Sequence, residues 1–522
     1  VTREDSSLED VDLKVWDGDT TIYSTEYFGG SDDKTGSDGY IHDILAIYKV
    51  YDGSSTGTEN TTYIKVRYGD WFLSENEVFD ETTTIDVDIP VFRVYNVDSQ
   101  VGYSYIQRAI DNASAGDEII LSLGTFNENI VIDKVLTLSG SGTGTIITVQ
   151  PPFGMSSPPI ADWTVPGINV TSAAVTISNL LISNFTTGIS AFQADSLVLE
   201  YVYVEDIQGI GIHIDSSTSV EFSDVTVTGS EGSNIVVEEN STSMKILHSH
   251  ITQSEQSGVI VRSGSDDFEM QNVVIDFNED YGCLFASNDV TISNSQMRFN
   301  GLNGIYVQSI NEADLSNNDF EGNGLSELKI ISSYDIILED NFFNATEFDG
   351  GGWGIDTSGS SRIEIGNNVL ELGIKLYDAD NFTIYDNEFN NITYGNNYEQ
   401  KTAMLIGGYD NILSNNIINN VGFGLVFLTD ADNNLVENNT ILGASTDVEY
   451  YTLGQNNTFI NTEINTVDIL ENSYFETLNY VDIQMFTVNG PVDGVELNVR
   501  NGEVDVYSTE YYGGSDETTY SD

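Results

Sequence analysis

Apolar and polar residues alternate along residues 11–97, in runs such as VDLKVW, ILAIYKVY and TTYIKVRY. A period of two is the pattern of strands that bury one face. Turn-rich clusters such as GGSDDKTGSDG and DGSSTGTEN separate these runs. Five to seven short strands within about 90 residues predict an antiparallel β-sandwich over residues 1–98.

The pattern changes over residues 99–485. Ile106, Ala109 and Ile110 have helical spacing and predict a helix at about 104–113, which short strands follow. From about 166 to 465 the pattern repeats every 21–27 residues. A period of this size predicts a solenoid, in which each coil buries its apolar face against its neighbours. About 13–15 coils spaced about 4.8 Å apart would form a rod of about 65–70 Å.

Two columns of residues recur within the repeat. The first column precedes short apolar runs and contains Gly167, Gly188, Gly211, Asn234, Gly258, Gly282, Gly304, Gly354 and Gly424. The second lies between two strands and contains Asn179, Asp224, Asn272, Asn294, Asn317, Asp340, Asn367, Asp386, Asn415 and Asn438. We expect the glycines to supply bends with positive φ. We expect the second column to stack into side-chain amide ladders between coils.

Two segments resemble known families. The segment YSYIQRAIDNASAGDEIILSLGTFNENIVIDKVLTLSGSG, which starts at Tyr103, resembles the first coils of right-handed parallel β-helices of the pectate-lyase-like superfamily. The turn Thr35–Tyr40 resembles that of carboxypeptidase-regulatory-like and other Ig-like surface modules. Together they resemble archaeal proteins of S-layers, sheaths and appendages. The resemblance implies an all-β fold, in which a right-handed parallel β-helix is flanked by Ig-like β-sandwich domains.

The chain also contains a duplicated segment. Residues 495–516 repeat residues 11–32, so we interpret 486–522 as the first strands of a second sandwich that repeats 11–38. Two strands alone are marginally stable, so we expect this segment to pair with the next unit. The candidate assembly residues are Val495, Leu497, Val499, Tyr507, Tyr511 and Tyr512. Head-to-tail contacts give open polymers, which predicts an extracellular structural protein whose self-assembled homopolymer is a filament, sheath or surface lattice.

The net charge narrows the class of partner. The chain has 83 acidic and 17 basic residues, a formal net charge of −66, which argues against binding of nucleic acid or anionic membranes. No apolar stretch is long enough to predict a membrane span. The single Cys283 excludes an intrachain disulfide. We expect an extracellular or cell-surface location, with glycosylation candidates at Asn60, Asn112, Asn169, Asn184, Asn240, Asn344, Asn381, Asn391, Asn438 and Asn456.

Calcium is the one candidate cofactor. Acidic residues recur in the duplicated turn, at Asp32, Asp33 and Asp38 and again at Asp516, Glu517 and Asp522. Oxygen-rich loops suit Ca²⁺. An ordinary turn stabilised by its own Asp side chains explains the same residues and is the favoured reading.

Catalysis is not predicted. The segment between Lys134 and Lys245 contains no Lys or Arg, although lyases of this superfamily need a basic residue. So acidic a rod would also repel an anionic polymer. His248 and His250 are expected to face the same side of one strand, as a surface pair. The alternative is a polysaccharide-active enzyme or a glycan-binding adhesin that uses the β-helix groove. It requires convergent acid and base groups or a stacked aromatic platform, and its partners would be surface glycans.

Overall fold

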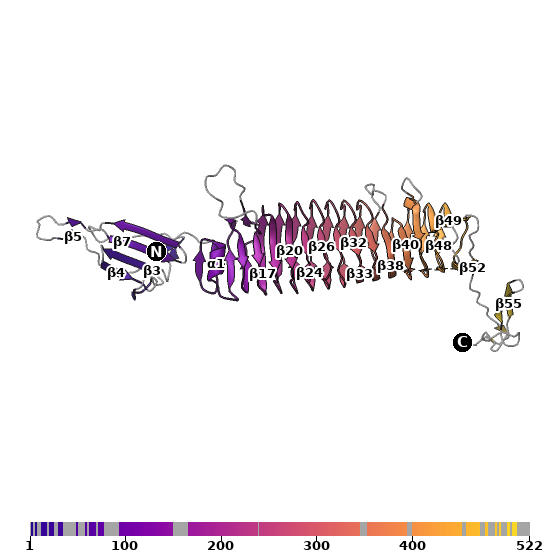
Figure 1. The fold of residues 1–522 in the computed structure, drawn as a ribbon, viewed down its shortest axis with the longest axis horizontal. Coiled ribbons are helices and arrows are strands. Elements are labelled where there is room, and N and C mark those ends of the chain that lie inside the picture. Colours follow the sequence, from indigo (N-terminus) through magenta and orange to yellow (C-terminus); the bar gives the residue numbers. More distant parts are fainter. Residues whose placement is uncertain are drawn as a thin grey trace.

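The computed structural model describes residues 2–3, 6–7, 12–17, 20–25, 30–34, 49–50, 58–59, 62–68, 71–77, 93–149, 165–238, 240–344, 352–393, 399–450, 456–469, 476–478, 486–487, 490–491, 498–501 and 504–508. More than half of the described residues are in β-strands, and most of the described chain forms one long solenoid (Figure 1). Among these residues, no helix has the length and apolar character needed to cross a membrane.

The N-terminal region contains one antiparallel sheet in the order β4-β3-β7-β8. Its strands are β3 (Asp12–Asp17), β4 (Thr20–Ser24), β7 (Thr62–Tyr68) and β8 (Trp71–Glu77). Two short antiparallel pairs accompany it, β1 (Thr2–Arg3) with β2 (Ser6–Ser7) and β5 (Lys49–Val50) with β6 (Thr58–Glu59). The described part of residues 1–98 does not contain a second packed sheet, so a complete sandwich stays a prediction.

The two copies of the duplicated segment form the same hairpin. In β3 and β4, Val15 lies opposite Tyr23 and a bulge follows Val15. In β55 (Asn498–Asn501) and β56 (Val504–Ser508), Val499 lies opposite Tyr507 and a bulge follows Val499. β53 (Phe486–Thr487) pairs with β54 (Gly490–Pro491) just before it. The other predicted assembly residues, Val495, Leu497, Tyr511 and Tyr512, lie outside the described residues.

The solenoid begins with β9 (Val94–Asn96), which pairs antiparallel with β10 (Val101–Tyr103) and with β11 (Glu118–Leu121). Helix α1 (Ile106–Asn112) covers this end and buries Ile106, Ala109 and Ile110. Its first N–H groups, those of Ile106 and Gln107, donate to the carboxylate of Glu128 at 2.9 and 3.1 Å. Burial raises the pKa of Glu128, although these hydrogen bonds oppose the rise. The exposed apolar end of the rod is thereby capped.

The rod consists of three parallel sheets and about 14 turns. The first sheet contains β11, β14 (Leu136–Ser139), β21 (Glu221–Ser223), β24 (Met244–Leu247), β27 (Phe268–Gln271), β30 (Val290–Ser293), β33 (Asn311–Ser316), β36 (Tyr334–Glu339), β41 (Thr383–Tyr385), β44 (Ile412–Ser414), β47 (Leu435–Glu437), β50 (Thr458–Ile460) and β52 (Glu476–Leu478).

The second sheet contains β12 (Gly124–Asn127), β15 (Thr145–Thr148), β22 (Thr226–Thr228), β25 (His250–Thr252), β28 (Val274–Asp276), β31 (Gln296–Arg298), β34 (Asp319–Glu321), β37 (Phe342–Asn344), β39 (Val369–Leu370), β42 (Glu388–Asn390), β45 (Ile417–Asn419) and β48 (Thr440–Leu442). The long strands β17 (Val175–Ser183) and β19 (Val198–Glu205) run through both the first and the second sheet.

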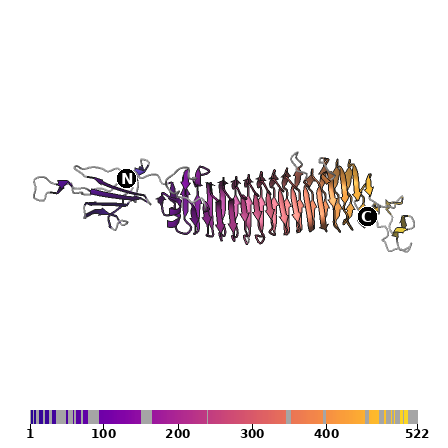
Figure 2. The same cartoon turned by 45° about the horizontal axis from the view of Figure 1, so that its top comes forward.

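The third sheet contains β13 (Ile130–Ile132), β16 (Ile168–Val170), β18 (Thr187–Phe192), β20 (Ile210–Asp215), β23 (Ile235–Val237), β26 (Val259–Val261), β29 (Cys283–Phe285), β32 (Ile305–Gln308), β35 (Leu328–Ile331), β40 (Ile374–Asp380), β43 (Thr402–Ile406), β46 (Phe423–Phe427), β49 (Thr446–Tyr450) and β51 (Val467–Ile469). β38 (Ile355–Gly366) continues from the third sheet into the first, and a 3-10 turn spans Glu399–Lys401. Figure 2 shows the strands stacked in line along the rod.

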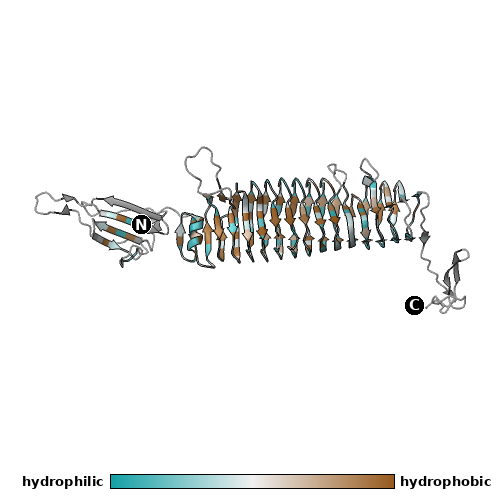
Figure 3. Ribbon diagram, viewed as in Figure 1, coloured by the Kyte–Doolittle hydropathy of each residue, from teal (hydrophilic) through white to brown (hydrophobic). Residues whose placement is uncertain are grey.

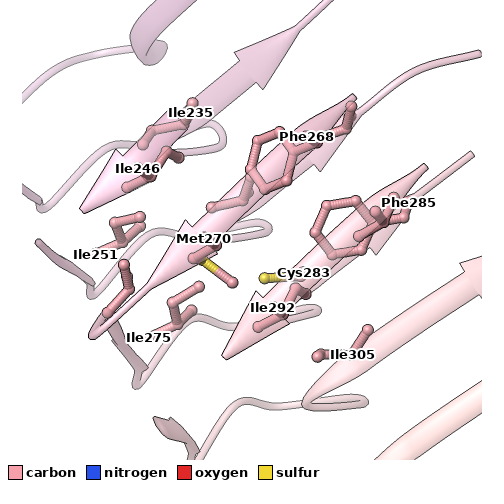
Figure 4. Close-up of a cluster of buried hydrophobic side chains, with 14 of the residues drawn as sticks. Ile235, Ile246, Ile251, Phe268, Met270, Ile275, Cys283, Phe285, Ile292 and Ile305 are labelled. Carbon is pink, nitrogen blue, oxygen red and sulfur yellow. The ribbon is translucent and has the colours of Figure 1, made fainter. Parts of the chain in front are cut away.

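Alternation within each strand builds the core. The inward side chains are apolar and fully buried, whereas their neighbours face solvent (Figure 3). Rings stack between successive coils, as in Phe320–Phe343, whose centroids are 4.8 Å apart. Cys283 lies among such residues (Figure 4), and burial raises the pKa of its thiol. Parallel strands that all bury one side explain the apolar repeat of the sequence.

The glycine column is needed for space rather than for positive φ, so the sequence-based explanation was wrong. None of its glycines has a left-handed φ. A Cβ at Gly211 would lie 2.5 Å from the carbonyl oxygen of Asn234, and one at Gly282 would lie 2.5 Å from that of Gly304. Each glycine therefore allows one coil to approach the backbone of the next.

The amide ladder lies one residue beyond the predicted column. The column residues occupy the corner between the first and second sheets, with left-handed φ values such as 57° at Asn317. The next residue points inward, and six such asparagines stack: Asn318, Asn341, Asn368, Asn387, Asn416 and Asn439. In each of the first five, the backbone N–H and the side-chain Nδ2 both donate to Oδ1 of the next asparagine, at 2.9–3.1 Å. Ladders therefore satisfy the buried polar groups of this corner.

Candidate functional site

The predicted calcium turn is held by its own hydrogen bonds. The backbone N–H of Ser24 donates to Oδ2 of Asp32 at 2.6 Å, and the Tyr23 hydroxyl donates to the carbonyl oxygen of Asp33. Asp38, Asp516, Glu517 and Asp522 lie outside the described residues. Within the described ranges, no three His, Cys, Asp or Glu side chains come together as metal ligands. Calcium at this turn stays a prediction.

Five of the predicted glycosylation sites lie at exposed corners where the asparagine has a left-handed φ: Asn240, Asn381, Asn391, Asn438 and Asn456. Asn112 is exposed in α1, whereas Asn169, Asn184 and Asn344 are half-buried. The amide of Asn184 donates to Oγ1 of Thr148. Asn60 lies outside the described residues. These five sequons therefore coincide with corner positions that also favour asparagine for its backbone conformation.

A cluster of charged side chains lies on the outer face of the second sheet. Thr252, Asp276, Arg298 and Glu321 lie in register on β25, β28, β31 and β34. His250 Nε2 lies 2.9 Å from Asp276 Oδ1, and Arg298 Nη2 donates to Asp276 Oδ2 at 3.3 Å. The Asp276 side chain is only 7% exposed, whereas that of His250 is 47% exposed. Three successive coils thus bring an acid, an imidazole and a guanidinium together.

Asp276 and Asp319 on β34 are two carboxyl groups on the outer face of the second sheet, and their surroundings shift their pKa values in opposite directions. Burial disfavours ionisation of Asp276, but hydrogen bonds from His250 and Thr252 and the charge of Arg298 outweigh it and lower its pKa. Burial raises the pKa of Asp319, and Arg298 only partly opposes the rise. Asp276 is therefore the ionised carboxylate and Asp319 the carboxyl group that holds its proton longer. Two carboxyls whose pKa values are pushed apart are the arrangement of an acid and a base.

One polar atom in the cluster has no partner. Nε of Arg298 is buried and has no hydrogen-bond acceptor among the described residues, while Nη2 of the same guanidinium donates to Asp276. A buried donor without an acceptor is uncommon in folded proteins.

A stacked aromatic pair borders this cluster. Phe277 and Phe299 directly follow Asp276 and Arg298, at the corner between the second and third sheets. Their rings stack with centroids 5.4 Å apart and planes at 20°, and Phe277 is 56% exposed. Both have left-handed φ values, 54° and 52°. Left-handed backbone costs about 1–2 kcal/mol at a residue with a Cβ, and elsewhere this corner carries Asn184, Asp206, Gln253, Asn391, Asn420 and glycines such as Gly229, Gly322 and Gly443.

The residues behind the two rings hold this conformation in place. Asn278 donates to Oδ1 of Asn300 through its backbone N–H at 3.2 Å and its Nδ2 at 2.9 Å. Asn300 donates in the same two ways to Asn323, at 3.0 and 2.9 Å. This second ladder fixes the corner directly after each phenylalanine. Strain of this kind persists where the surroundings over-determine it, and it is concentrated at functional positions.

A second charged pair lies on the third sheet. Lys329 on β35 contacts Asp356 on β38, and Lys375 lies in register on the next coil. Oδ1 of Asp356 is buried and has no hydrogen-bond partner among the described residues. The pair contains a single carboxyl group, so it does not supply both an acid and a base. The second sheet is therefore the stronger candidate for chemistry.

The histidines do not lie as predicted. His250 is on β25, but His248 lies at the corner between the first and second sheets, with a left-handed φ of 49°. The two side chains therefore do not share one strand, and His250 belongs to the Asp276 cluster instead. Sequence reasoning missed Asp276, Arg298 and Asp319 because each comes from a different coil. The appearance of Phe at two corner positions was the one signal that could have located the site.

Comparisons with known proteins agree with the fold. The family model described as right handed beta helix region matches residues 137–275 and 257–403. No curated protein matches the chain. Three solved structures are similar in part: the A-module of a mannuronan C-5 epimerase from Azotobacter vinelandii (14% identity, 72% of this chain and 95% of that one, TM-score 0.47), an alginate lyase from Paenibacillus (14%, 54% and 91%, 0.33) and a family 28 exopolygalacturonase from Yersinia enterocolitica (9%, 89% and 94%, 0.36).

Two predictions are corrected by these findings. The prediction of a self-assembling structural protein is wrong, and so is the prediction that the chain is not an enzyme, because the similar structures carry the names of polysaccharide enzymes. The small number of basic residues and the acidity of the rod had argued against an enzyme that acts on an anionic polymer. A pair of carboxyl groups that act as acid and base needs few cations, and the second sheet carries two carboxyl groups whose pKa values are shifted in opposite directions.

Proposed function

This chain belongs to the right-handed β-helix family, and we propose that it binds a polysaccharide across its second sheet and hydrolyses glycosidic bonds there. The observation that carries the proposal is the pair Asp276 and Asp319, whose surroundings shift their pKa values in opposite directions on the same outer face. The stacked rings of Phe277, which is exposed, and Phe299, which is half-buried, lie at the edge of that face.

The two carboxyl groups have distinct roles in this proposal. Asp319 donates its proton to the oxygen of the glycosidic bond as the bond to the anomeric carbon breaks. A water molecule attacks that carbon, and Asp276 accepts the proton that the water loses. His250 and Arg298 keep Asp276 ionised and fix its orientation, because each carboxylate oxygen accepts one of their hydrogen bonds and keeps a free lone pair. Both carboxyl groups return to their starting states by exchange with solvent.

The spacing of the strands favours inversion at the anomeric carbon. β28 and β34 are two coils apart, so their backbones are separated by about 10 Å. An inverting pair needs carboxyl groups about 6.5–9.5 Å apart to leave room for water, whereas a retaining pair lies about 5 Å apart. Side chains that start from these two strands suit the longer separation. The product would therefore have the opposite anomeric configuration to the bond that is cleaved.

The test is release of reducing ends from a panel of soluble polysaccharides at pH 4–7. We expect the wild-type chain to cleave at least one polymer, and Asp276→Asn and Asp319→Asn each to lower the rate about 100-fold or more. Asp314→Asn is the matched control, because Asp314 is an exposed acid of the same coil on the first sheet. Equal loss in all three variants, or no cleavage by the wild type, would reject hydrolysis at this site.

A glycan-binding adhesin is the second candidate, favoured by the stacked aromatic pair with its exposed Phe277. It predicts binding of a polysaccharide without release of reducing ends, so the same panel separates the two functions. We also propose that the protein is extracellular and that residues 1–98 form an Ig-like sandwich that carries the solenoid. Secretion of the native chain into culture medium and an experimental structure of residues 1–98 would test these two points.

A further inference from the structure

We propose that Phe277 and Phe299 form a stacking platform for the apolar face of a pyranose ring, and that the glycan bound there is uncharged. This inference rests on the proposed function at the second sheet and adds the class of substrate. Three observations carry it: the exposure of Phe277 in the stacked pair, the backbone conformation that presents the pair, and the pairing of every nearby lysine and arginine with a carboxylate.

The aromatic pair has the form of a ligand-binding surface. The rings stack one against the other, and Phe277 is 56% exposed whereas Phe299 is half-buried. The core offers a contrast, because the stacked pair Phe320 and Phe343 is fully buried. An exposed aromatic ring loses the stabilisation that burial gives. The exposed ring of Phe277, stacked on Phe299 with both residues at strained corner positions, is therefore explained by a ligand better than by the fold.

The neighbouring charges determine which sugars fit. Residues 240–325 contain three lysines and arginines, and each contacts a carboxylate: Lys245 with Glu269, Arg262 with Glu238, and Arg298 with Asp276. Asp276, Asp319 and Glu321 lie on the face beside the rings. A uronate polymer would bring more carboxylates to this surface, and the described part of these coils has no lysine or arginine without an acidic partner to receive them. Charge therefore favours a neutral glycan.

The test compares the wild-type chain with the double variant Phe277→Asn/Phe299→Asn. Asparagine tolerates left-handed backbone, so the double variant should unfold at the same temperature or a higher one. Calorimetry with soluble β-glucan, galactomannan and xylan should show binding of at least one of them by the wild type. The double variant should bind that polymer about tenfold or more weakly. Gln253→Asn is the matched control, since Gln253 has the same corner position with a φ of 53° and should bind like the wild type.

Other outcomes would overturn the inference in separable ways. Wild-type binding that the double variant retains would reject the platform and leave the proposed function intact. Binding restricted to polygalacturonate or alginate would reject the uncharged substrate. Self-association of the wild type that the double variant abolishes, with equal glycan affinity in both, would assign the rings to contact between copies. Failure of the wild type to bind any of these polymers would reject the proposed function itself.

Discussion

The two inner corners of the solenoid have the same backbone conformation but carry different residues. At the corner between the first and second sheets, the left-handed position is Asn or Asp in most coils and a buried amide ladder follows it. At the corner between the second and third sheets, a shorter ladder also follows, but two of the left-handed positions are Phe277 and Phe299. The first corner follows the preferences of the backbone except at positions such as Tyr201, whose φ is 52°, whereas the second departs from them in two successive coils beside the charged cluster. The two successive departures support the proposed function of the second corner, whereas the regular ladder of the first corner serves stability.

The largest expected effect breaks the first corner. Asn341→Ala removes the acceptor of two bonds from Asn318, and it removes the Nδ2 donor of one bond to Asn368 and of one bond to the carbonyl oxygen of Leu315, all of them buried. Each unsatisfied buried group costs about 1–3 kcal/mol, so we expect the free energy of unfolding to fall by about 3 kcal/mol or more. Urea denaturation measures this fall. Asn317→Gly is the control, because its side chain is outside the ladder and glycine tolerates its φ; a change above about 0.5 kcal/mol there would contradict the assignment.

The next effect concerns the glycine column. Gly282→Ala would place a Cβ 2.5 Å from the carbonyl oxygen of Gly304. Overpacking of this kind costs about 1–3 kcal/mol, which thermal unfolding would detect. Gly142→Ala separates space from conformation, since nothing lies within 4 Å of its added Cβ and only its φ of 101° is unfavourable. If Gly282→Ala were neutral, close approach between coils would not explain the column.

Exchange of residues between the corners sharpens the comparison. Asn294→Phe puts a bulky residue at a left-handed position of the first corner, where φ is 52°. We expect it to lower the free energy of unfolding by about 1 kcal/mol, and Phe277→Asn to raise it by a similar amount. Thermal unfolding of both variants tests the pair. Changes of the same sign would mean that ring contacts, rather than backbone strain, dominate at Phe277.

The smallest effects are those of pH. The proposed hydrolysis requires Asp276 to be ionised and Asp319 to be protonated. The rate of hydrolysis should therefore fall as pH rises through the raised pKa of Asp319. It should also fall in strong acid, below pH 3.8, where Asp276 takes up a proton. Because the pKa of Asp276 is lowered in the folded state, its contribution to stability is present above its unfolded pKa and is lost as pH falls through the folded pKa. Asp276→Asn should remove that acid dependence of the unfolding temperature, and an unchanged dependence would contradict the assigned shift.

The repeat made the solenoid predictable, because the columns at Gly211 and Asn317 recur once in every coil. The physical role of each column was not predictable, since a one-dimensional pattern does not show that Asn318 points inward or that Gly282 faces a carbonyl oxygen. The site was missed for a related reason. Asp276 and Asp319 are separated by nearly two periods, and only the register of β28, β31 and β34 brings them to one face.

The amide ladder of the first corner has a consequence for how the rod grows. From Asn318 to Asn416, each backbone N–H and one N–H of each Nδ2 donate to the asparagine of the next coil toward the C-terminus, and the backbone N–H of Asn439 donates to Oγ1 of Thr462. These donors point the same way along the rod, so the ladder has a direction. Each coil of the ladder therefore has unsatisfied donors until the next coil toward the C-terminus is in place. Completion of the ladder then follows the chain from Asn318 toward Thr462.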